Sequence, residues 1–141
     1  MNEEKEKPIQ LQENDTYQDG DIFYAYVHFA EDVEQGKERP IVAMKDQDTD
    51  TWKAFKITSQ IGKKLNHKYG YLMEDWAESG LTKPSIIKCD RESIYNIDPN
   101  NIIKKIGDLT EQDLKGLLMK IVTVREIEYR RERQKINEAE R

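Results

Sequence analysis

The chain has 141 residues, of which 36% are charged, and its formal net charge is −5. This length predicts one domain built around one core. No apolar run is long enough to cross a bilayer, the acidic first residues do not resemble a signal peptide, and Cys89, the one cysteine, excludes an internal disulfide. We therefore expect a cytoplasmic protein, since a reducing compartment suits a lone cysteine.

The charges are unevenly distributed along the chain. Residues 1–19 contain six carboxylates and two lysines, a net charge of −4, which leaves −1 for the remainder. A segment of this composition is predicted to be a disordered acidic leader. The alternative interpretation is that the leader covers a basic groove elsewhere in the molecule.

Three strands are predicted after this leader. The run "DIFYAYVHF", residues 21–29, alternates between two faces and is rich in aromatic residues, which is typical of a strand buried on one side. A charged loop, residues 29–40, is expected before the second strand, "IVAMK", residues 41–45. The turn "DQDTD" leads into the third strand, "TWKAFKITS", residues 51–59. The predicted core faces carry Phe23, Ala25, Val27 and Phe29 in the first strand, and Phe55 and Ile57 in the third.

Shorter elements are predicted in the following segment. Residues 69–73 are expected to form a short strand and residues 74–80 one helical turn. Residues 85–90 and 92–98 are predicted as two more short strands.

One helix is predicted near the end of the chain, over residues 108–122. Thr110 is its expected N-cap, with an acidic residue three positions later. Its predicted apolar stripe comprises Leu114, Leu117, Leu118 and Ile121. The charged residues 122–141 either extend this helix into solvent or fray. Together, the elements of residues 20–121 predict a small barrel or curled sheet with a helix packed against it.

A pair of polar residues is expected to meet at one end of the second and third strands. If these strands form an antiparallel hairpin, Arg39 falls opposite Ile57 or Thr58. Pro40 holds Arg39 in an extended conformation, and Thr58 shares the wetter face of its strand with Lys56. A guanidinium beside a hydroxyl is suited to hold a phosphate. The alternative is that Arg39 pairs with a nearby carboxylate, Glu34 or Glu38, and that Thr58 is only a good strand former.

Other residues suggest single-stranded nucleic acid. Five lysines lie close in sequence to aromatic residues, the combination that holds single strands by charge and stacking. They are Lys53, Lys56, Lys63, Lys64 and Lys68. An alternative is that the lysines are only solvated. Two histidines and one cysteine without ligand spacing predict no metal site, and nothing indicates a cofactor.

Four segments carry a resemblance to a known family. They are "GDIFYAYVHFAEDVEQGKERPIVAM", "ITSQI", "GLTKPSIIKCD" and "IIKKIGDLTEQDL". In this order and spacing, from Gly20 to about Ile121, they resemble the MazF/PemK family of toxin endoribonucleases. The resemblance implies a mainly β fold with a C-terminal helix, a small SH3-like barrel of the MazF/PemK/CcdB type. It also implies a homodimer, a cognate antitoxin, and metal-independent cleavage of single-stranded RNA.

The resemblance assigns roles to individual residues. Arg39 and Thr58 match the family's catalytic pair, which promotes attack of the RNA 2′-hydroxyl on the adjacent phosphate to give a 2′,3′-cyclic phosphate and a 5′-hydroxyl. The residues predicted to bind RNA are Lys56, Ser59, Gln60, Lys63, Lys64, Ser85 and Glu34. Two alternatives are an SH3-like module that binds nucleic acid or protein without cleaving it, and a CcdB-like poison of another macromolecule.

Overall fold

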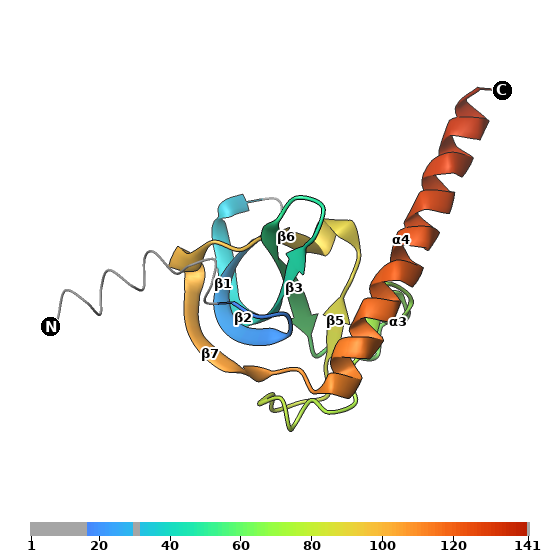
Figure 1. Cartoon of the computed structure of the whole chain (residues 1–141). Coiled ribbons are helices and arrows are strands. Elements are labelled where there is room, and N and C mark those ends of the chain that lie inside the picture. Colours follow the sequence, from blue (N-terminus) through green and yellow to red (C-terminus); the bar gives the residue numbers. More distant parts are fainter. Residues whose placement is uncertain (1–16, 30–31, 141) are drawn as a thin grey trace, which may run out of the picture.

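The computed structural model describes the backbone of residues 17–29 and 32–140, and the side chains of residues 17–28 and 36–140. Most of the predicted acidic leader, residues 1–16, lies outside the described residues, as does the side chain of Phe29. Figure 1 shows a strongly curled sheet with one long helix along its side and the end of that helix extending away. In the described residues, no helix is long and apolar enough to cross a membrane.

Seven strands pair antiparallel in the order β4-β5-β3-β2-β1-β7, and β6 pairs with β3. The strands are β1 Asp21–Phe29, β2 Asp32–Asp46, β3 Thr51–Thr58, β4 Gly70–Leu72, β5 Ile86–Lys88, β6 Ile94–Asn96 and β7 Ile102–Asp108. The helices are α3 Lys64–Tyr69 and α4 Glu111–Ala139, with short 3₁₀ turns η1 Arg91–Ser93 and η2 Pro99–Asn101. The predicted architecture, a curled mainly β fold with a C-terminal helix, is confirmed.

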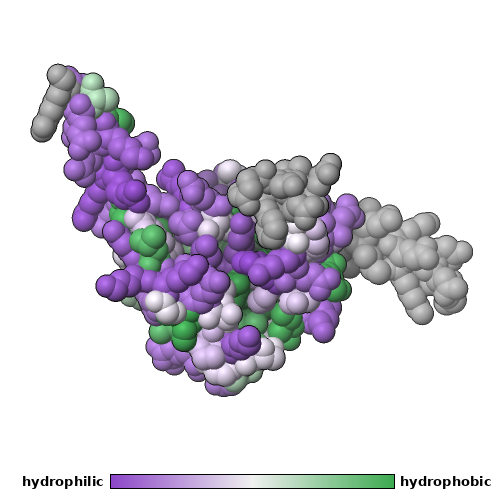
Figure 2. All heavy atoms as spheres, turned by 180° about the vertical axis from the view of Figure 1, so that it is seen from behind, coloured by the Kyte–Doolittle hydropathy of each residue, from purple (hydrophilic) through white to green (hydrophobic). Residues whose placement is uncertain are grey.

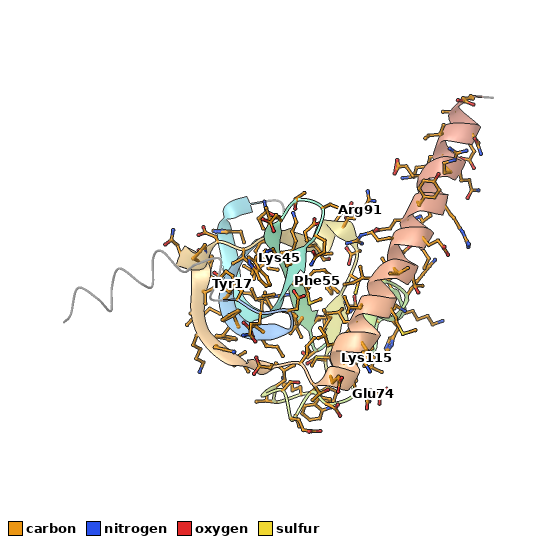
Figure 3. All side chains as sticks on the ribbon, viewed as in Figure 1. Tyr17, Lys45, Phe55, Glu74, Arg91 and Lys115 are labelled. Carbon is orange, nitrogen blue, oxygen red and sulfur yellow. The ribbon has the colours of Figure 1, made fainter. Side chains whose placement is uncertain are left out.

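The apolar side chains form two clusters, one on each side of the sheet. Phe55 and Ile57 of β3 belong to a cluster that α4 covers, as predicted, and Ile22 of β1 lies in the same cluster. Ala54, from the face of β3 expected to be wetter, is fully buried in the second cluster, inside the curl of the sheet. Tyr17 also packs in that second cluster (Figure 3). The expectation of a single core is therefore wrong, because a curled sheet buries both of its faces.

The predicted loop at residues 29–40 is wrong in its main part. Residues 32–40 continue β2, and the register pairs Gly36 with His28 and Pro40 with Tyr24. This half of β2 pairs with β1 and extends beyond its ladder with β3, and among its described side chains Lys37 and Glu38 are exposed. The charged residues correctly indicate a segment exposed to solvent, but that segment is a strand and not a loop.

The start of helix α4 was predicted from its cap. The Thr110 hydroxyl accepts a hydrogen bond from the backbone N–H of Asp113 at 3.3 Å. The buried Asp113 carboxylate accepts from the Tyr71 hydroxyl at 2.7 Å and from two backbone N–H groups of residues 74 and 75. These bonds tie the first turn of α4 to the strand and loop beneath it.

The apolar stripe of α4 differs from the prediction at one position. Leu117 and Val124 are fully buried, whereas Leu118 is 48% exposed because one residue turns a helix by about 100°. The helix continues to Ala139, and its last turns stand clear of the sheet (Figure 1). Figure 2 shows that the surface of this projecting part is mostly hydrophilic. Short amphipathic patterns did not reveal α3 or β7. Residues 76–80 form a turn, in which the Ser79 N–H donates to the Asp75 carbonyl at 3.1 Å, so the predicted single helical turn is present but does not continue into a helix.

Candidate functional site

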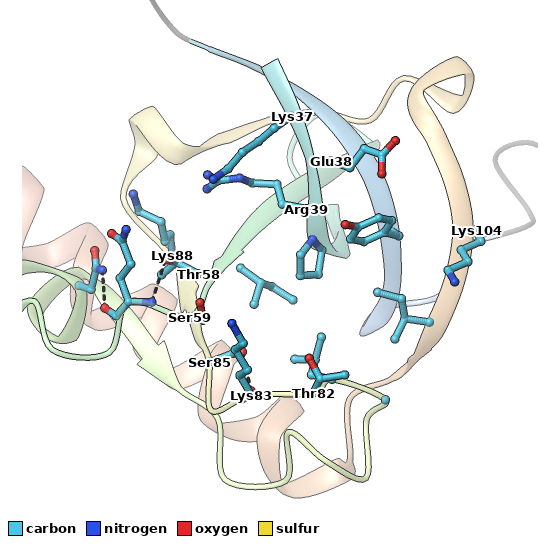
Figure 4. Close-up of a pocket in the computed structure, with 18 of the residues that line it drawn as sticks. Lys37, Glu38, Arg39, Thr58, Ser59, Thr82, Lys83, Ser85, Lys88 and Lys104 are labelled. Atoms are coloured by element: carbon cyan, nitrogen blue, oxygen red, sulfur yellow. Dashed lines mark hydrogen bonds between the residues drawn. The ribbon is translucent and has the colours of Figure 1, made fainter. Parts of the chain in front are cut away.

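A cavity of about 940 Å³ opens where β2 and β3 separate. The paired ladder ends at Ile41 and Lys56. Beyond it, Pro40 offers no backbone N–H to a ladder, and β3 turns away to pair with β5 through Ile57 and Thr58. The space between the strands is bounded on its other sides by residues 80–85, by β7 and by the segment leading into α3 (Figure 4).

Arg39 and Thr58 line this same cavity. The β2–β3 register, continued past its last pair, places the two residues opposite each other, as the hairpin geometry predicted. Figure 4 shows Arg39 and Thr58 on the same side of the opening, contributed by adjacent strands. The pairing of β2 with β3 therefore brings Arg39 and Thr58, which are distant in sequence, to the opening of the same cavity. Their catalytic role stays a prediction.

The guanidinium of Arg39 is not neutralised by its neighbour. Glu38 and Arg39 are consecutive in a strand, so their side chains leave opposite faces, and Figure 4 shows them pointing apart. Among the described residues, no hydrogen bond or ion pair joins Arg39 to another side chain. The alternative in which Glu38 pairs with Arg39 therefore does not describe this structure. The side chain of Glu34 lies outside the described residues.

The site crowds positive charges together. Burial lowers the pKa of Lys56, and the positive charges of Lys88 and Arg39 lower it further. The negative charge of Asp90 raises the pKa of Lys56, but its effect is smaller than those of burial and of the two cations. The three cations therefore repel one another, and a bound anion would relieve that repulsion.

The hydroxyl groups at the mouth have defined partners. The Thr58 hydroxyl oxygen accepts the backbone N–H of Gln60 at 3.1 Å, which leaves its own O–H proton free to donate. The buried Ser85 hydroxyl donates to the Lys83 carbonyl at 2.9 Å. Thr58 thus retains a donor for a ligand, whereas the donor of Ser85 is used to hold the turn.

Most of the predicted site residues share this cavity. Those that line it are Arg39, Thr58, Ser59, Gln60, Lys63 and Ser85. Lys56 does not line the cavity, although its charge interacts with Lys88 and Arg39, which do; its ammonium lies 5.9 Å from the centre of the Tyr95 ring. Lys64 is exposed on α3 and does not line the cavity.

Five further lysines line the cavity that the sequence did not single out: Lys37, Lys83, Lys88, Lys104 and Lys105. Lys83 and Lys88 stand in the segment "GLTKPSIIKCD", and Lys104 and Lys105 stand in "IIKKIGDLTEQDL". Motifs shared with a family were the only signal available for them. The local pattern of apolar residues gives no such signal for Lys104 and Lys105, because β7 reaches the site only by pairing with β1, which is distant in sequence.

The cavity is strongly electropositive although the chain is acidic. Seven lysines and arginines line it against one carboxylate, Glu38. Lys105 is committed to ion pairs with Asp21 at 3.3 Å and Asp108 at 3.0 Å. The six remaining cations have no ion pair among the described residues. In the part of the chain that the structure describes, no group of three His, Cys, Asp or Glu residues is arranged to hold a metal ion.

Fold and site together define a small curled-sheet protein with an electropositive groove where β2 and β3 separate. The chain matches the family model described as the PemK-like, MazF-like toxin of type II toxin–antitoxin systems over residues 18–125. The chain belongs to this family, which confirms the resemblance drawn from the sequence motifs.

A solved structure supports the fold. The Mycobacterium tuberculosis toxin MazF-mt6 superposes with a TM-score of 0.53 at 18% sequence identity, covering 74% of this chain and 96% of that one. At this identity the match supports the barrel-like fold alone. No curated protein sequence matches the chain.

Proposed function

We propose that this chain is the toxin of a type II toxin–antitoxin pair and a metal-independent endoribonuclease that cleaves single-stranded RNA. One observation carries the proposal: Arg39 and Thr58 line one cavity in which six of the seven cations have no ion pair among the described residues. A phosphodiester is the anion that this combination of guanidinium, hydroxyl and lysines suits.

In the proposed reaction, the RNA supplies its own nucleophile. The 2′-hydroxyl loses its proton to solvent and attacks the adjacent phosphorus, forming a 2′,3′-cyclic phosphate as the bond to the 5′-oxygen breaks. The leaving oxygen gains a proton and becomes the 5′-hydroxyl. Such a reaction needs correct placement of the phosphate and stabilisation of the developing negative charge.

Arg39 and Thr58 divide these tasks. Arg39 stays protonated near neutral pH because a guanidinium pKa lies above about 12, so it stabilises charge first and donates a proton to the leaving oxygen second. The free O–H of Thr58 donates to a phosphate oxygen, since its oxygen already accepts the Gln60 N–H. Lys63 and the exposed Ser59 hold the neighbouring backbone of the RNA.

The antitoxin is proposed to occupy the same groove. An acidic segment of a partner protein would meet the same unpaired cations, and an extended or helical peptide is a common occupant of such a groove. We also retain the prediction of a homodimer from the family resemblance, with the chain acting in the cytoplasm.

The test is cleavage of a long single-stranded RNA in the presence of EDTA. The native chain should produce cyclic-phosphate and 5′-hydroxyl ends, and Arg39→Ala should lose at least about a hundredfold in rate, as when one charge-stabilising donor is removed. Arg133→Ala and Thr123→Ala are matched controls, because both residues are exposed on α4 outside the cavity. RNA that binds tightly but stays intact would support a binding module instead, and loss of cleavage in EDTA alone would contradict metal independence.

A further inference from the structure

A second groove, of about 730 Å³, continues from the first. Lys63, Asn66 and Lys88 line both cavities, so the two meet at the start of α3 and the end of β5. The second groove then runs between the segment 88–92 and the projecting half of α4. A single strand of RNA that leaves the Arg39–Thr58 site in this direction would pass Lys63 and Lys88 and enter the second groove.

Contacts between the segment 88–92 and α4 fix the position of one wall of this groove relative to the other. The Glu128 carboxylate of α4 accepts the backbone N–H of Arg91 at 3.0 Å and lies 3.7 Å from its guanidinium. One turn earlier, Arg125 donates to the Cys89 carbonyl at 2.9 Å. Figure 3 shows Arg91 on the side of the barrel that faces the projecting helix. The groove is therefore preformed rather than a chance gap beside a free helix end.

The lining of the second groove suits bases better than a run of phosphates. Five cations and four carboxylates line it, so it lacks the excess positive charge of the first cavity. It carries two tyrosines instead. Tyr129 is 61% exposed, and the Tyr69 hydroxyl accepts a hydrogen bond from Arg131 at 2.6 Å, which fixes that guanidinium at the groove wall. Flat rings and a held guanidinium are the surfaces on which unstacked RNA bases stack.

The α4 wall of the groove lies beyond the part of the chain that matches the family. The family match ends at residue 125, whereas the α4 residues that line the groove lie between Glu128 and Lys135. Residues in the matched region therefore form the first cavity, and residues beyond it form this wall of the second. The wall is a feature that the family match does not account for.

We propose that the second groove is a nucleotide subsite, in which Tyr129 and Arg131 stack against bases of the RNA segment that flanks the cleaved bond. The proposal rests on the proposed function, because it takes RNA to be the occupant of the first cavity. It adds a source of substrate selectivity that depends on the length and bases of the flanking segment.

The experiment compares the binding of two uncleavable 2′-O-methyl RNAs, of about six and about sixteen nucleotides, the span of single-strand sites on small barrels. The native chain should bind the longer RNA more tightly. Tyr129→Ala and Arg131→Ala should each reduce the ratio of the two affinities by about tenfold, the loss expected when one stacking contact is removed. Tyr129→Phe keeps the ring and should preserve the ratio. Arg133→Ala, on the same helix but outside both cavities, is the matched control.

The outcomes separate this proposal from the nuclease. A length-dependent affinity that Tyr129→Ala abolishes, in a chain that cuts no RNA, would support the subsite and overturn the nuclease. Cleavage by a chain whose affinities are unchanged by both Tyr129→Ala and Arg131→Ala would support the nuclease and overturn the subsite, leaving the groove to a protein partner. An equal reduction of the affinity ratio in Arg133→Ala would also overturn the subsite, because the effect would then come from the net charge of the helix.

Discussion

The first cavity predicts a steep dependence of RNA binding on salt. Six of its seven cations have no ion pair among the described residues. Each phosphate that a cation neutralises on a single strand contributes about −0.7 to the slope of log affinity against log salt. If all six engage, the slope approaches about −4, so a fourfold rise in salt lowers the affinity about three hundredfold.

The assay is a salt titration of the affinity for an uncleavable RNA. Lys83→Gln removes one cation from the mouth of the cavity (Figure 4) and should reduce the slope by about 0.7. Only the backbone carbonyl of Lys83 bonds to Ser85, so the turn should persist in the variant. Lys115→Gln is the control, because Lys115 is an exposed residue of α4 that pairs with Glu111 at 3.9 Å and lines neither cavity.

Two results would refute this reasoning. A slope close to zero in the native chain would mean that the cations of the cavity do not meet phosphates. An equal reduction in Lys83→Gln and Lys115→Gln would mean that only the net charge of the protein matters.

Three further predictions concern stability and assembly. Gly116→Ala should lower the free energy of unfolding by about 1–3 kcal/mol in a denaturant titration, because the added Cβ would lie 2.5 Å from the Tyr71 hydroxyl. Gly62→Ala is the control and should not lower it, because a Cβ at Gly62 would meet no atom within 4 Å. Because the folded-state pKa of Lys56 is depressed, its charged form destabilises the fold below that pKa, and the penalty disappears as pH rises toward 10.5. Lys56→Gln should therefore raise the unfolding free energy at neutral pH, and the gain should shrink at alkaline pH. Light scattering should give the mass of a dimer, and Met119→Glu, at an apolar position that is 72% exposed on α4, should lower it to that of a monomer; a monomeric native chain would contradict the prediction.

Local patterns were enough to predict the elements that depend on neighbours in sequence. β1 and β3 follow from alternating apolar residues, and the start of α4 follows from Thr110 and the acidic residue three positions later. The proximity of Arg39 and Thr58 could also be predicted from local sequence. It required only that two strands joined by a short turn pair antiparallel.

Long-range pairing explains what local patterns could not predict. β7 brings Lys104 and Lys105 to the cavity only because it pairs with β1, some eighty residues earlier in the chain. The charged sequence of residues 122–141 is compatible with either an extended helix or a frayed segment. The groove beside α4 depends on contacts such as that between Glu128 and Arg91, which no periodicity encodes. Ala54 was misplaced because a strand inside a curled sheet is buried on both faces.

The cavity cations that have no ion pair among the described residues also predict how the proposed antitoxin would act. Their mutual repulsion opposes folding, and the apolar clusters do not require it, so these charges are best explained by an external polyanion. RNA and an acidic antitoxin segment are both polyanions, and each would relieve the same repulsion at Lys56, Lys88 and Arg39. Binding of one should therefore exclude the other. An acidic peptide added to the complex with uncleavable RNA should displace the RNA completely, and a stable ternary complex would show that the antitoxin acts from another surface.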